Sequence, residues 1–213
     1  MVAALVLDGH PNPDSLTAAM AQAYTAGHGD ARLIALRDLD FDIHMRYGYQ
    51  AHMPLEPDLE HAKRAMHQSK RIVVATPMWW GSVPALLKGF FDRALLPQEE
   101  YRYGRFGLPQ GLLSGRRGRV LLMADTPRIA VPLLGIHAAA QVRRHTLAFC
   151  GVRTARVNRF LGVKDSTPER RVVWLDRART LGAADGSLDM ATTMPPVRTT
   201  EFRDSMLRSQ RPA

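Results

Sequence analysis

The sequence contains little cysteine and no long apolar run, and both absences exclude classes of protein. Its single cysteine, Cys150, permits no intramolecular disulfide, which agrees with a reducing compartment. No apolar run approaches the roughly 20 residues that a membrane-spanning helix needs. The first residues, Met1 to Asp8, have a strand pattern without the basic start of a signal peptide. We therefore expect a cytoplasmic protein without a membrane span.

Signatures of metal and nucleotide sites are also missing. The eight histidines and the single cysteine show no zinc-type spacing, so we predict no metal site. Neither Gly-x-Gly-x-x-Gly nor the Lys-Ser/Thr pair of a P-loop occurs, which disfavours a dinucleotide fingerprint or an NTPase. The net charge is +9, but arginines such as those in 116–119, 143–144 and 170–171 are scattered, which argues against a nucleic-acid partner. We interpret most of them as solubilising residues whose field attracts small anions.

The residue pattern alternates between predicted strands and predicted helices. Two segments, 38–57 and 97–115, show neither pattern, and we interpret them as long loop excursions. Five strands separated by helices favour an α/β fold, a doubly wound parallel sheet covered on both faces. We expect one domain over 1–182, followed by a C-terminal tail over 183–213 that contains Pro195 and Pro196. The predicted strands are 2–7, 32–36, 71–75, 119–124 and 154–160, and the predicted helices are 17–24, 58–69, 83–95, 137–149 and 166 to about 181.

The most informative segment joins the strand at 71–75 to the amphipathic helix at 83–95 through a tight loop. Pro77 is expected to end the strand, and Pro84 suits the first turn of the helix. The loop carries Trp79 and Trp80, and two adjacent indoles on such a turn cannot both point into one core. A core plug explains one tryptophan, whereas a large planar ligand explains both. In open parallel sheets, ligands bind at the carboxyl ends of the strands, which is where this loop lies.

This segment resembles the NAD(P)H:quinone oxidoreductase family of flavodoxin-like flavoproteins, whose members carry a proline, an apolar residue, aromatic residues, then Val-Pro-Ala and Leu-Lys-Gly here. The resemblance covers most of residues 1–160. It implies a flavodoxin-like fold with strand order 2-1-3-4-5, which brings the loops at 9–17 and 77–83 to one crevice. It also implies a flavin cofactor, FAD or FMN, with NAD(P)H as co-substrate. The further matching motifs are Gly9-His10-Pro11, Ser15-Leu16-Thr17, Tyr101-Arg102-Tyr103, Gly135-Ile136-His137 and Leu147-Ala148-Phe149-Cys150-Gly151.

Three loops supply the predicted cofactor-binding residues. In the first loop, backbone N–H groups at the start of a helix suit an anion, and the resemblance implies flavin phosphate there. The alternative is that Ser15 only caps the helix. In the third loop, Pro127 stands where members of the resembled family often have flexible glycines. A proline has no backbone N–H, so the loop has one hydrogen-bond donor fewer. The predicted residues are His10, Ser15, Leu16 and Thr17 in the first loop, Pro77, Met78, Trp79, Trp80 and Gly81 in the second, and Asp125, Thr126 and Pro127 in the third.

The resemblance places His137, Tyr101 and Tyr103 on the substrate side, as candidate catalytic residues. Val131 stands where the family has a tyrosine that accompanies the histidine, which weakens a proton relay. The alternatives are a structural histidine and ordinary loop packing of Tyr103. Cys150 is expected to be a small buried hydrophobe rather than a nucleophile.

The resemblance implies a homodimeric oxidoreductase that reduces quinones by two-electron, ping-pong hydride transfer from NAD(P)H. An azo- or nitroreductase shares the hydride step and differs in its acceptor. A regulatory flavoprotein subunit of a potassium efflux system also remains open. An electron-carrier flavodoxin is disfavoured, because such carriers are usually shorter and acidic. The sequence does not decide between FMN and FAD or between NADH and NADPH. It also does not identify the physiological acceptor.

Overall fold

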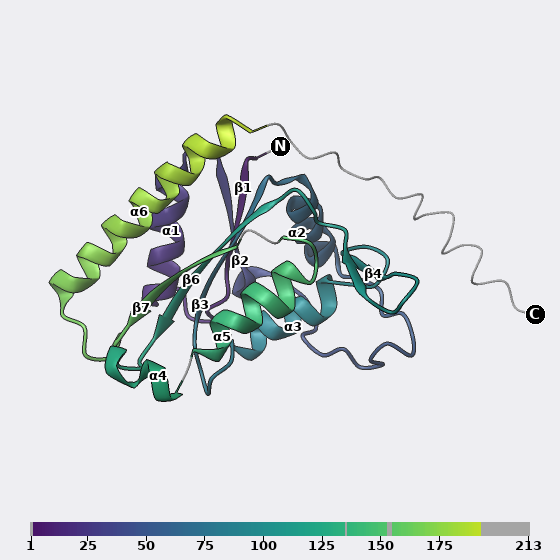
Figure 1. Ribbon diagram of the computed structural model, residues 1–213, viewed down its shortest axis with the longest axis horizontal. Coiled ribbons are helices and arrows are strands. Elements are labelled where there is room, and N and C mark those ends of the chain that lie inside the picture. The colour runs from purple at the N-terminus through teal and green to yellow at the C-terminus, as the bar shows by residue number, and fades with distance from the viewer. Residues whose placement is uncertain (1, 135, 153–154, 193–213) are drawn as a thin grey trace, which may run out of the picture.

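The computed structural model describes residues 2–134, 136–152 and 155–192, and its centre is a five-stranded parallel sheet (Figure 1). The strand order is β2-β1-β3-β6-β7, because β4 and β5 pair with each other outside this sheet. Counted along the sheet strands alone, this is the order 2-1-3-4-5, so the predicted fold class and topology are confirmed. The strands are β1 (Ala4–Asp8), β2 (Ala31–Ala35), β3 (Arg71–Pro77), β6 (Arg117–Ala124) and β7 (Arg156–Leu161).

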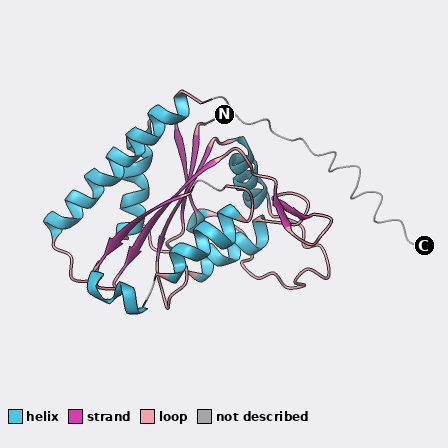
Figure 2. Cartoon of the chain, viewed as in Figure 1, coloured by secondary structure: helices cyan, strands magenta, loops and turns pink. Residues whose placement is uncertain are grey.

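Helices cover both faces of the sheet (Figures 1 and 2). The pair α1 (Leu16–His28) and α6 (Pro168–Met190) covers one face. The other face carries α2 (Pro57–Gln68), α3 (Ala85–Ala94), and the continuous helical stretch formed by α5 (His137–Ala140) and the π-helical segment η3 (Gln141–Ala148). Two layers of helix around one sheet bury both strand faces, as parallel sheets require.

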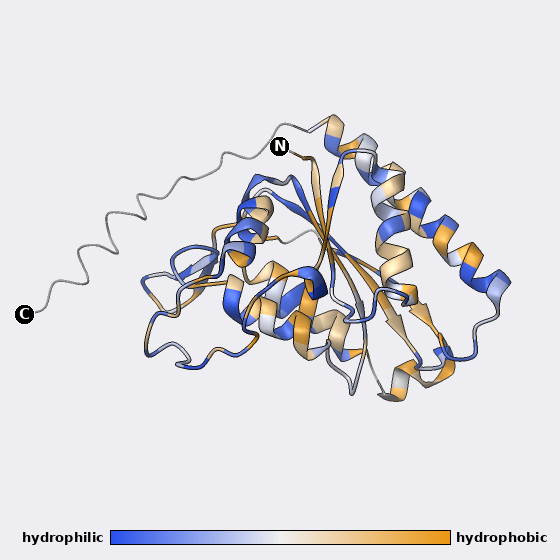
Figure 3. Ribbon diagram, turned by 180° about the vertical axis from the view of Figure 1, so that it is seen from behind, coloured by the Kyte–Doolittle hydropathy of each residue, from blue (hydrophilic) through white to orange (hydrophobic). Residues whose placement is uncertain are grey.

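Alternate residues of the central strands feed two separate cores. On β3, Val73 and Ala75 pack with Met20 of α1 in the first core, whereas Ile72 and Val74 pack in the second core, which also contains Phe90 of α3. This alternation follows from the two-residue period of a strand. Figure 3 shows the result as largely apolar strands between helices in which hydrophilic and hydrophobic residues alternate.

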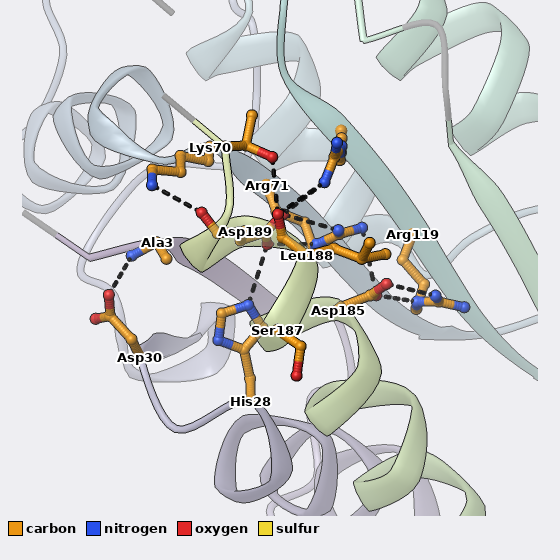
Figure 4. A network of polar contacts seen from close by, with 12 residues as sticks. Ala3, His28, Asp30, Lys70, Arg71, Arg119, Asp185, Ser187, Leu188 and Asp189 are labelled. Atoms are coloured by element: carbon orange, nitrogen blue, oxygen red, sulfur yellow. Dashed lines mark hydrogen bonds and ion pairs between the residues drawn. The ribbon is translucent and has the colours of Figure 1, made fainter. Parts of the chain in front are cut away.

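The last helix is longer than its sequence pattern predicts. The pattern predicts an end near Leu181, yet α6 continues to Met190 and keeps Asp185 and Asp189 buried. These two carboxylates face arginines at the amino ends of β3 and β6 (Figure 4). The predicted division at residue 182 therefore runs through a helix, and residues 193–213 of the predicted tail lie outside the described residues.

Glycines let α6 approach α1 closely. A Cβ atom on Gly27 would meet the carbonyl oxygen of Arg179, and one on Gly182 would meet that of Tyr24. A Cβ on Gly186 would likewise meet the carbonyl oxygen of His28. Backbone contact of this kind requires residues without a side chain.

Several boundaries differ from the predictions for local reasons. The excursion at 97–115 contains a short antiparallel hairpin of β4 (Tyr101–Tyr103) and β5 (Pro109–Gly111), whose strands are too short to show an alternating pattern. Pro77 ends β3, as expected, although the strand runs two residues beyond the predicted range of 71–75. Gly135 and Thr154, which belong to a matching motif and to the predicted last strand, lie outside the described residues. The remaining elements are η1 (Leu36–Asp38), η2 (Arg128–Ala130) and α4 (Val131–Leu134).

The solubilising role that we expect for most of the arginines does not apply to Arg116 and Arg119, which are buried. Arg119 pairs with Asp185, and Arg116 donates to the carbonyl of His67. Within the described ranges, no helix has the length and apolar character needed to cross a bilayer. Over the same residues, no group of three or more His, Cys, Asp or Glu side chains is arranged to hold a metal ion.

Candidate functional site

Loops that follow β1, β3 and β6 meet at the carboxyl edge of the sheet. These three strands are neighbours in the sheet, so their loops leave side by side. The rings of His10 and Trp79 lie 5.3 Å apart between centroids, at 80° to each other. The N–H of Met78 donates to the carbonyl of Met123 at 2.8 Å, which joins the second loop to β6. The predicted convergence of the first two loops is therefore present.

The first loop is built on a buried carboxylate. Asp8, at the end of β1, accepts hydrogen bonds from the N–H of His10 at 3.1 Å and from the guanidinium of Arg37. The Nδ1 atom of His10 accepts the N–H of Asn12 at 2.9 Å. Burial lowers the pKa of His10 below its ordinary value, although Asp8 acts in the opposite direction. The ring is therefore mainly neutral at pH 7 and carries its proton on Nε2, where it is a donor.

Helix α1 begins inside this loop. The Oγ atom of Ser15 accepts the N–H of Ala18 at 3.1 Å, so Ser15 is a helix cap, as the alternative interpretation expects. Capping uses only an acceptor position, and the hydroxyl hydrogen of Ser15 stays available. The N–H groups of Leu16 and Thr17 have no acceptor inside the helix, by helix geometry. Ser15 and Leu16 are half-buried, whereas Thr17 is only 2% exposed and offers little surface to a ligand.

The second loop presents both indoles to solvent. Trp79 and Ser82 exchange two backbone hydrogen bonds of 2.9 Å, which closes a turn with Trp80 and Gly81 at its tip. Both tip residues have positive φ, 50° for Trp80 and 77° for Gly81. Trp80 is fully exposed and Trp79 is 44% exposed. Neither is a core plug, and a bulky residue in a left-handed conformation is a feature that often marks a ligand site.

The second loop also contacts the helical stretch that starts at His137. A Cβ atom placed on Gly81 would lie 4.0 Å from Cδ2 of His137, and His137 is exposed. The hydroxyl of Ser82 donates to Oε1 of Gln141 at 3.0 Å. Sequence reasoning missed the contact between Ser82 and Gln141, because no local pattern connects residues 59 positions apart.

The third loop follows β6. Oδ1 of Asp125 accepts the N–H of Lys164 at 2.7 Å, which ties this loop to the one after β7. Asp125 and Pro127 are exposed and Thr126 is half-buried. In the second loop, by comparison, Pro77 is buried within β3 and Met78 is half-buried. Among the predicted binding residues, Pro77 and Thr17 thus have the least surface open to a ligand.

The two tyrosines of β4 line a cavity of about 370 Å³ between α3 and η3. Tyr101 is 7% exposed and packs edge-on against Phe149 at 4.8 Å, whereas Tyr103 is 59% exposed. Burial, together with the neighbouring hydroxyl of Tyr49, raises the pKa of Tyr101. Gln141 lines the same cavity, so the cavity and the second loop share a neighbour.

Cys150 also lines this cavity. It is 2% exposed, and burial raises the pKa of its thiol to about 12. The prediction of a small buried hydrophobe is confirmed, because a thiol with such a pKa carries almost no thiolate at neutral pH.

The chemistry of the site suits a flavin. The start of α1 offers N–H groups and the positive end of a helix dipole to a phosphate. Two exposed indoles on the neighbouring loop offer flat apolar surface to a planar ring. These two features lie next to each other, as the contact between His10 and Trp79 shows. A phosphate joined to a large flat ring matches this pair of features.

Known proteins share both the sequence and the fold. A curated relative, the FMN-dependent NADH:quinone oxidoreductase of Azotobacter vinelandii, is 29% identical over 165 residues, which cover 64% of this chain and 81% of the relative. Matches to the other curated relatives span between 22% and 60% of those proteins' own length. The resemblance to NAD(P)H:quinone oxidoreductases is thereby confirmed.

Two solved structures share the fold at low sequence identity. The NAD(P)H:quinone oxidoreductase of Methanothermobacter marburgensis has a TM-score of 0.68 at 20% identity, covering 85% of this chain and 98% of that one. An FMN-dependent NADH-azoreductase of Bacillus anthracis in complex with FMN has a TM-score of 0.65 at 16% identity, covering 88% and 99%. The family model described as Flavodoxin-like fold matches residues 3–180. The chain belongs to this flavodoxin-like family.

Proposed function

We propose that this protein is an FMN-dependent NAD(P)H oxidoreductase that reduces quinones by two-electron, ping-pong hydride transfer. The observation that carries the proposal is the contact between His10, in the loop that leads into α1, and Trp79, which stands beside the fully exposed Trp80. The name of the Azotobacter relative supports both FMN and a quinone acceptor. When bound, the flavin supplies the hydride chemistry, and the chain supplies binding and orientation.

The first loop holds the flavin phosphate in this proposal. The N–H of Leu16, the hydroxyl of Ser15 and Nε2–H of His10 are the donors, and the helix dipole adds a favourable field. Thr17 is only 2% exposed, so its side chain contributes little contact area to the phosphate. A neutral His10 suits this role, because its single proton is already placed on the free nitrogen.

The second and third loops hold the ring. Trp79 and Trp80 stack on it and exclude water, and Pro77, Met78 and Gly81 fix the course of the loop. The backbone of the third loop, Asp125, Thr126 and Pro127, borders the polar side of the ring and helps to stabilise negative charge there. That Asp125 binds the backbone of Lys164 supports a role in holding this loop in place.

The acceptor side is formed by His137 and the two tyrosines. His137 stands at the loop tip beside Gly81, where its ring donates a proton to the oxygen of the quinone. Tyr101 and Tyr103 line the adjoining cavity and give it apolar walls. Large apolar side chains are exposed in two separate places, Phe106 in the β4–β5 hairpin and Ile129 and Leu133 in η2 and α4. A second copy of the chain covering them would give the homodimer that we expect, working in the cytoplasm where NAD(P)H is supplied.

The test is to purify the protein and release its chromophore for comparison with FMN and FAD. We expect a yellow protein that oxidises NADH or NADPH when menadione is present. A folded, colourless protein that binds neither added flavin contradicts the proposal. Turnover on a quinone, an azo dye and a nitroaromatic compound separates quinone reductase from azo- or nitroreductase. Co-purification with a membrane transporter, without turnover, would favour the regulatory subunit instead.

A further inference from the structure

Three arginines surround an open pocket of about 350 Å³ at the edge of the sheet. Arg128 starts η2, Arg159 belongs to the edge strand β7, and Arg177 belongs to α6. All three residues are exposed. In the part of the chain that the structure describes, none of the three makes an ion pair with a carboxylate, whereas buried Arg71 and Arg119 both do. No described carboxylate therefore competes with an anion for these guanidinium groups, and that of Arg177 also lies 5.8 Å from the ring centroid of Phe160.

The remaining walls of this arginine pocket are apolar or neutral. Val131, Val157 and Leu161 give apolar surface, and Asn158 adds an uncharged polar group. None of the described residues that line the pocket is acidic. A ligand that combines a highly charged anion with a flat, weakly polar body matches such walls. Arginine suits phosphate in particular, since its planar fork donates two parallel hydrogen bonds.

The arginine pocket adjoins the cofactor-binding edge. Arg128 directly follows Pro127 of the third loop. Leu161 pairs with Ala124, the residue at the end of β6 from which that loop departs. In Figure 1 the helix α4 lies beside the ends of β6 and β7, at the lower left. A long ligand that lies over the third loop would therefore place one end in this pocket.

We propose that the arginine pocket binds the 2′-phosphate of NADPH, with the adenosine on its apolar wall, so that the enzyme prefers NADPH to NADH. The inference rests on the proposed function and adds the identity of the co-substrate. A phosphate monoester carries a charge of about −1.5 to −2 at pH 7, which three guanidinium groups can match. NADH has only a hydroxyl at that position. An arginine beside the ribose is a general means of accepting the 2′-phosphate.

The kinetic test compares variants of two arginines on the same strand, in flavin-loaded protein. In Arg159→Gln we expect the ratio of kcat/KM for NADPH to that for NADH to fall about tenfold, since a hydrogen bond between charged groups is lost. Arg156→Gln is the matched control, because Arg156 is exposed on β7 but does not line the pocket. If the ratio of kcat/KM values falls equally in both variants, the effect comes from the overall charge of the protein, and the proposal is overturned.

A binding test removes the dependence on turnover. Calorimetry compares 2′,5′-ADP with 5′-AMP on the purified protein, and we expect 2′,5′-ADP to bind at least about tenfold more tightly. Arg159→Gln and Arg177→Gln should each weaken 2′,5′-ADP alone. Equal binding of the two nucleotides overturns the inference, even if the protein reduces quinones. If 2′,5′-ADP binds as expected but no flavin does, the proposed function fails and the phosphate site stands.

Discussion

Replacing Asp189 by asparagine should destabilise the protein although this residue lies far along the sequence from every predicted site residue. The carboxylate is fully buried. It accepts Nε of Arg71 at 2.7 Å and Nη2 at 2.9 Å, and it also accepts Nε2 of His28 at 3.1 Å (Figure 4). Arg71 is itself only 3% exposed, so it cannot turn to water when the charge of Asp189 is lost.

The size of the effect follows from that burial. Removing one partner of a buried ion pair costs about 3–5 kcal/mol, because the other charge remains without compensation. The amide of the asparagine side chain would keep the shape and some acceptor capacity, and Asp185 still lies 3.3 Å from Arg71, so the lower end applies. For a chain of this length, about 3 kcal/mol corresponds to a fall in Tm of about 6–12 °C.

The assay is thermal unfolding followed by circular dichroism, with Asp176→Asn as the control. Asp176 pairs with Arg179 at 3.5 Å, but both side chains are largely exposed, and such pairs contribute little. We expect the control to melt within about 2 °C of the wild type. If Asp189→Asn and Asp176→Asn melt at the same temperature, the buried network does not hold α6 in the way described.

Acid should abolish the difference between the wild type and Asp189→Asn. Burial opposes ionisation of Asp189, but the hydrogen bonds from His28 and Arg71 outweigh it and hold the pKa of Asp189 below its ordinary value. A lowered pKa in the folded state gives stability that is complete above the unfolded value of about 3.9. This contribution disappears as the pH falls through the lower folded value. A difference in Tm that stays constant down to the acid limit of folding would contradict the assignment.

Three further changes test other parts of the structure. Gly27→Ala should lower the free energy of unfolding by about 1–3 kcal/mol, because the new methyl group meets the carbonyl of Arg179; an unchanged denaturant midpoint would refute the close packing of α1 on α6. Trp80→Ala should leave Tm unchanged and weaken FMN binding by about tenfold in a fluorescence titration, and an unaltered Kd would remove Trp80 from the site. Cys150 should react with a thiol reagent at pH 8 only after unfolding, since its pKa is about 12, and rapid labelling of the native protein would show an open thiol.

The position of the site could be predicted because it depends on strand order and on short local patterns. Apolar runs identified the strands, and the order of the sheet places the loops after β1 and β3 next to each other. A purely local argument, that two adjacent indoles on a turn cannot both point into one core, predicted that at least one of Trp79 and Trp80 is exposed, and the structure exposes both. The tryptophan argument needs only this short loop, whereas the strand order came from the resemblance, which covers most of residues 1–160.

The parts that could not be predicted depend on contacts between distant segments. Asp185 and Asp189 fall in the segment predicted to be a tail, and only the structure shows that they lie on α6, buried against arginines of β3 and β6. The link between Ser82 and Gln141 has no local signal either. The hairpin of β4 and β5 is only three residues long on each strand, which is too short for a hydrophobic pattern.

Helix α1 connects the two edges of the sheet. It starts at the cap formed by Ser15, in the proposed phosphate loop, and it ends at His28, which donates to Asp189 at the opposite edge. Its 13 residues correspond to about 20 Å. A helix held at its far end by hydrogen bonds, and along its length by close packing on α6, cannot shift along its axis. The free N–H groups near Leu16 are therefore fixed in place by residues that never touch a ligand.

Arginines lie in two different settings at the two edges of the sheet. At the amino edge, carboxylates from α6 meet Arg71 and Arg119, and the resulting pairs are buried and structural. At the carboxyl edge, Arg128, Arg159 and Arg177 are exposed and line a pocket without a carboxylate. Of these five arginines, only the two that meet an acidic residue of α6 are buried in ion pairs, and the other three are exposed. Introducing an acid at the pocket, as in Val157→Glu, should therefore turn these arginines inward and weaken 2′,5′-ADP binding, measured below the Tm of the variant because Val157 packs against the core.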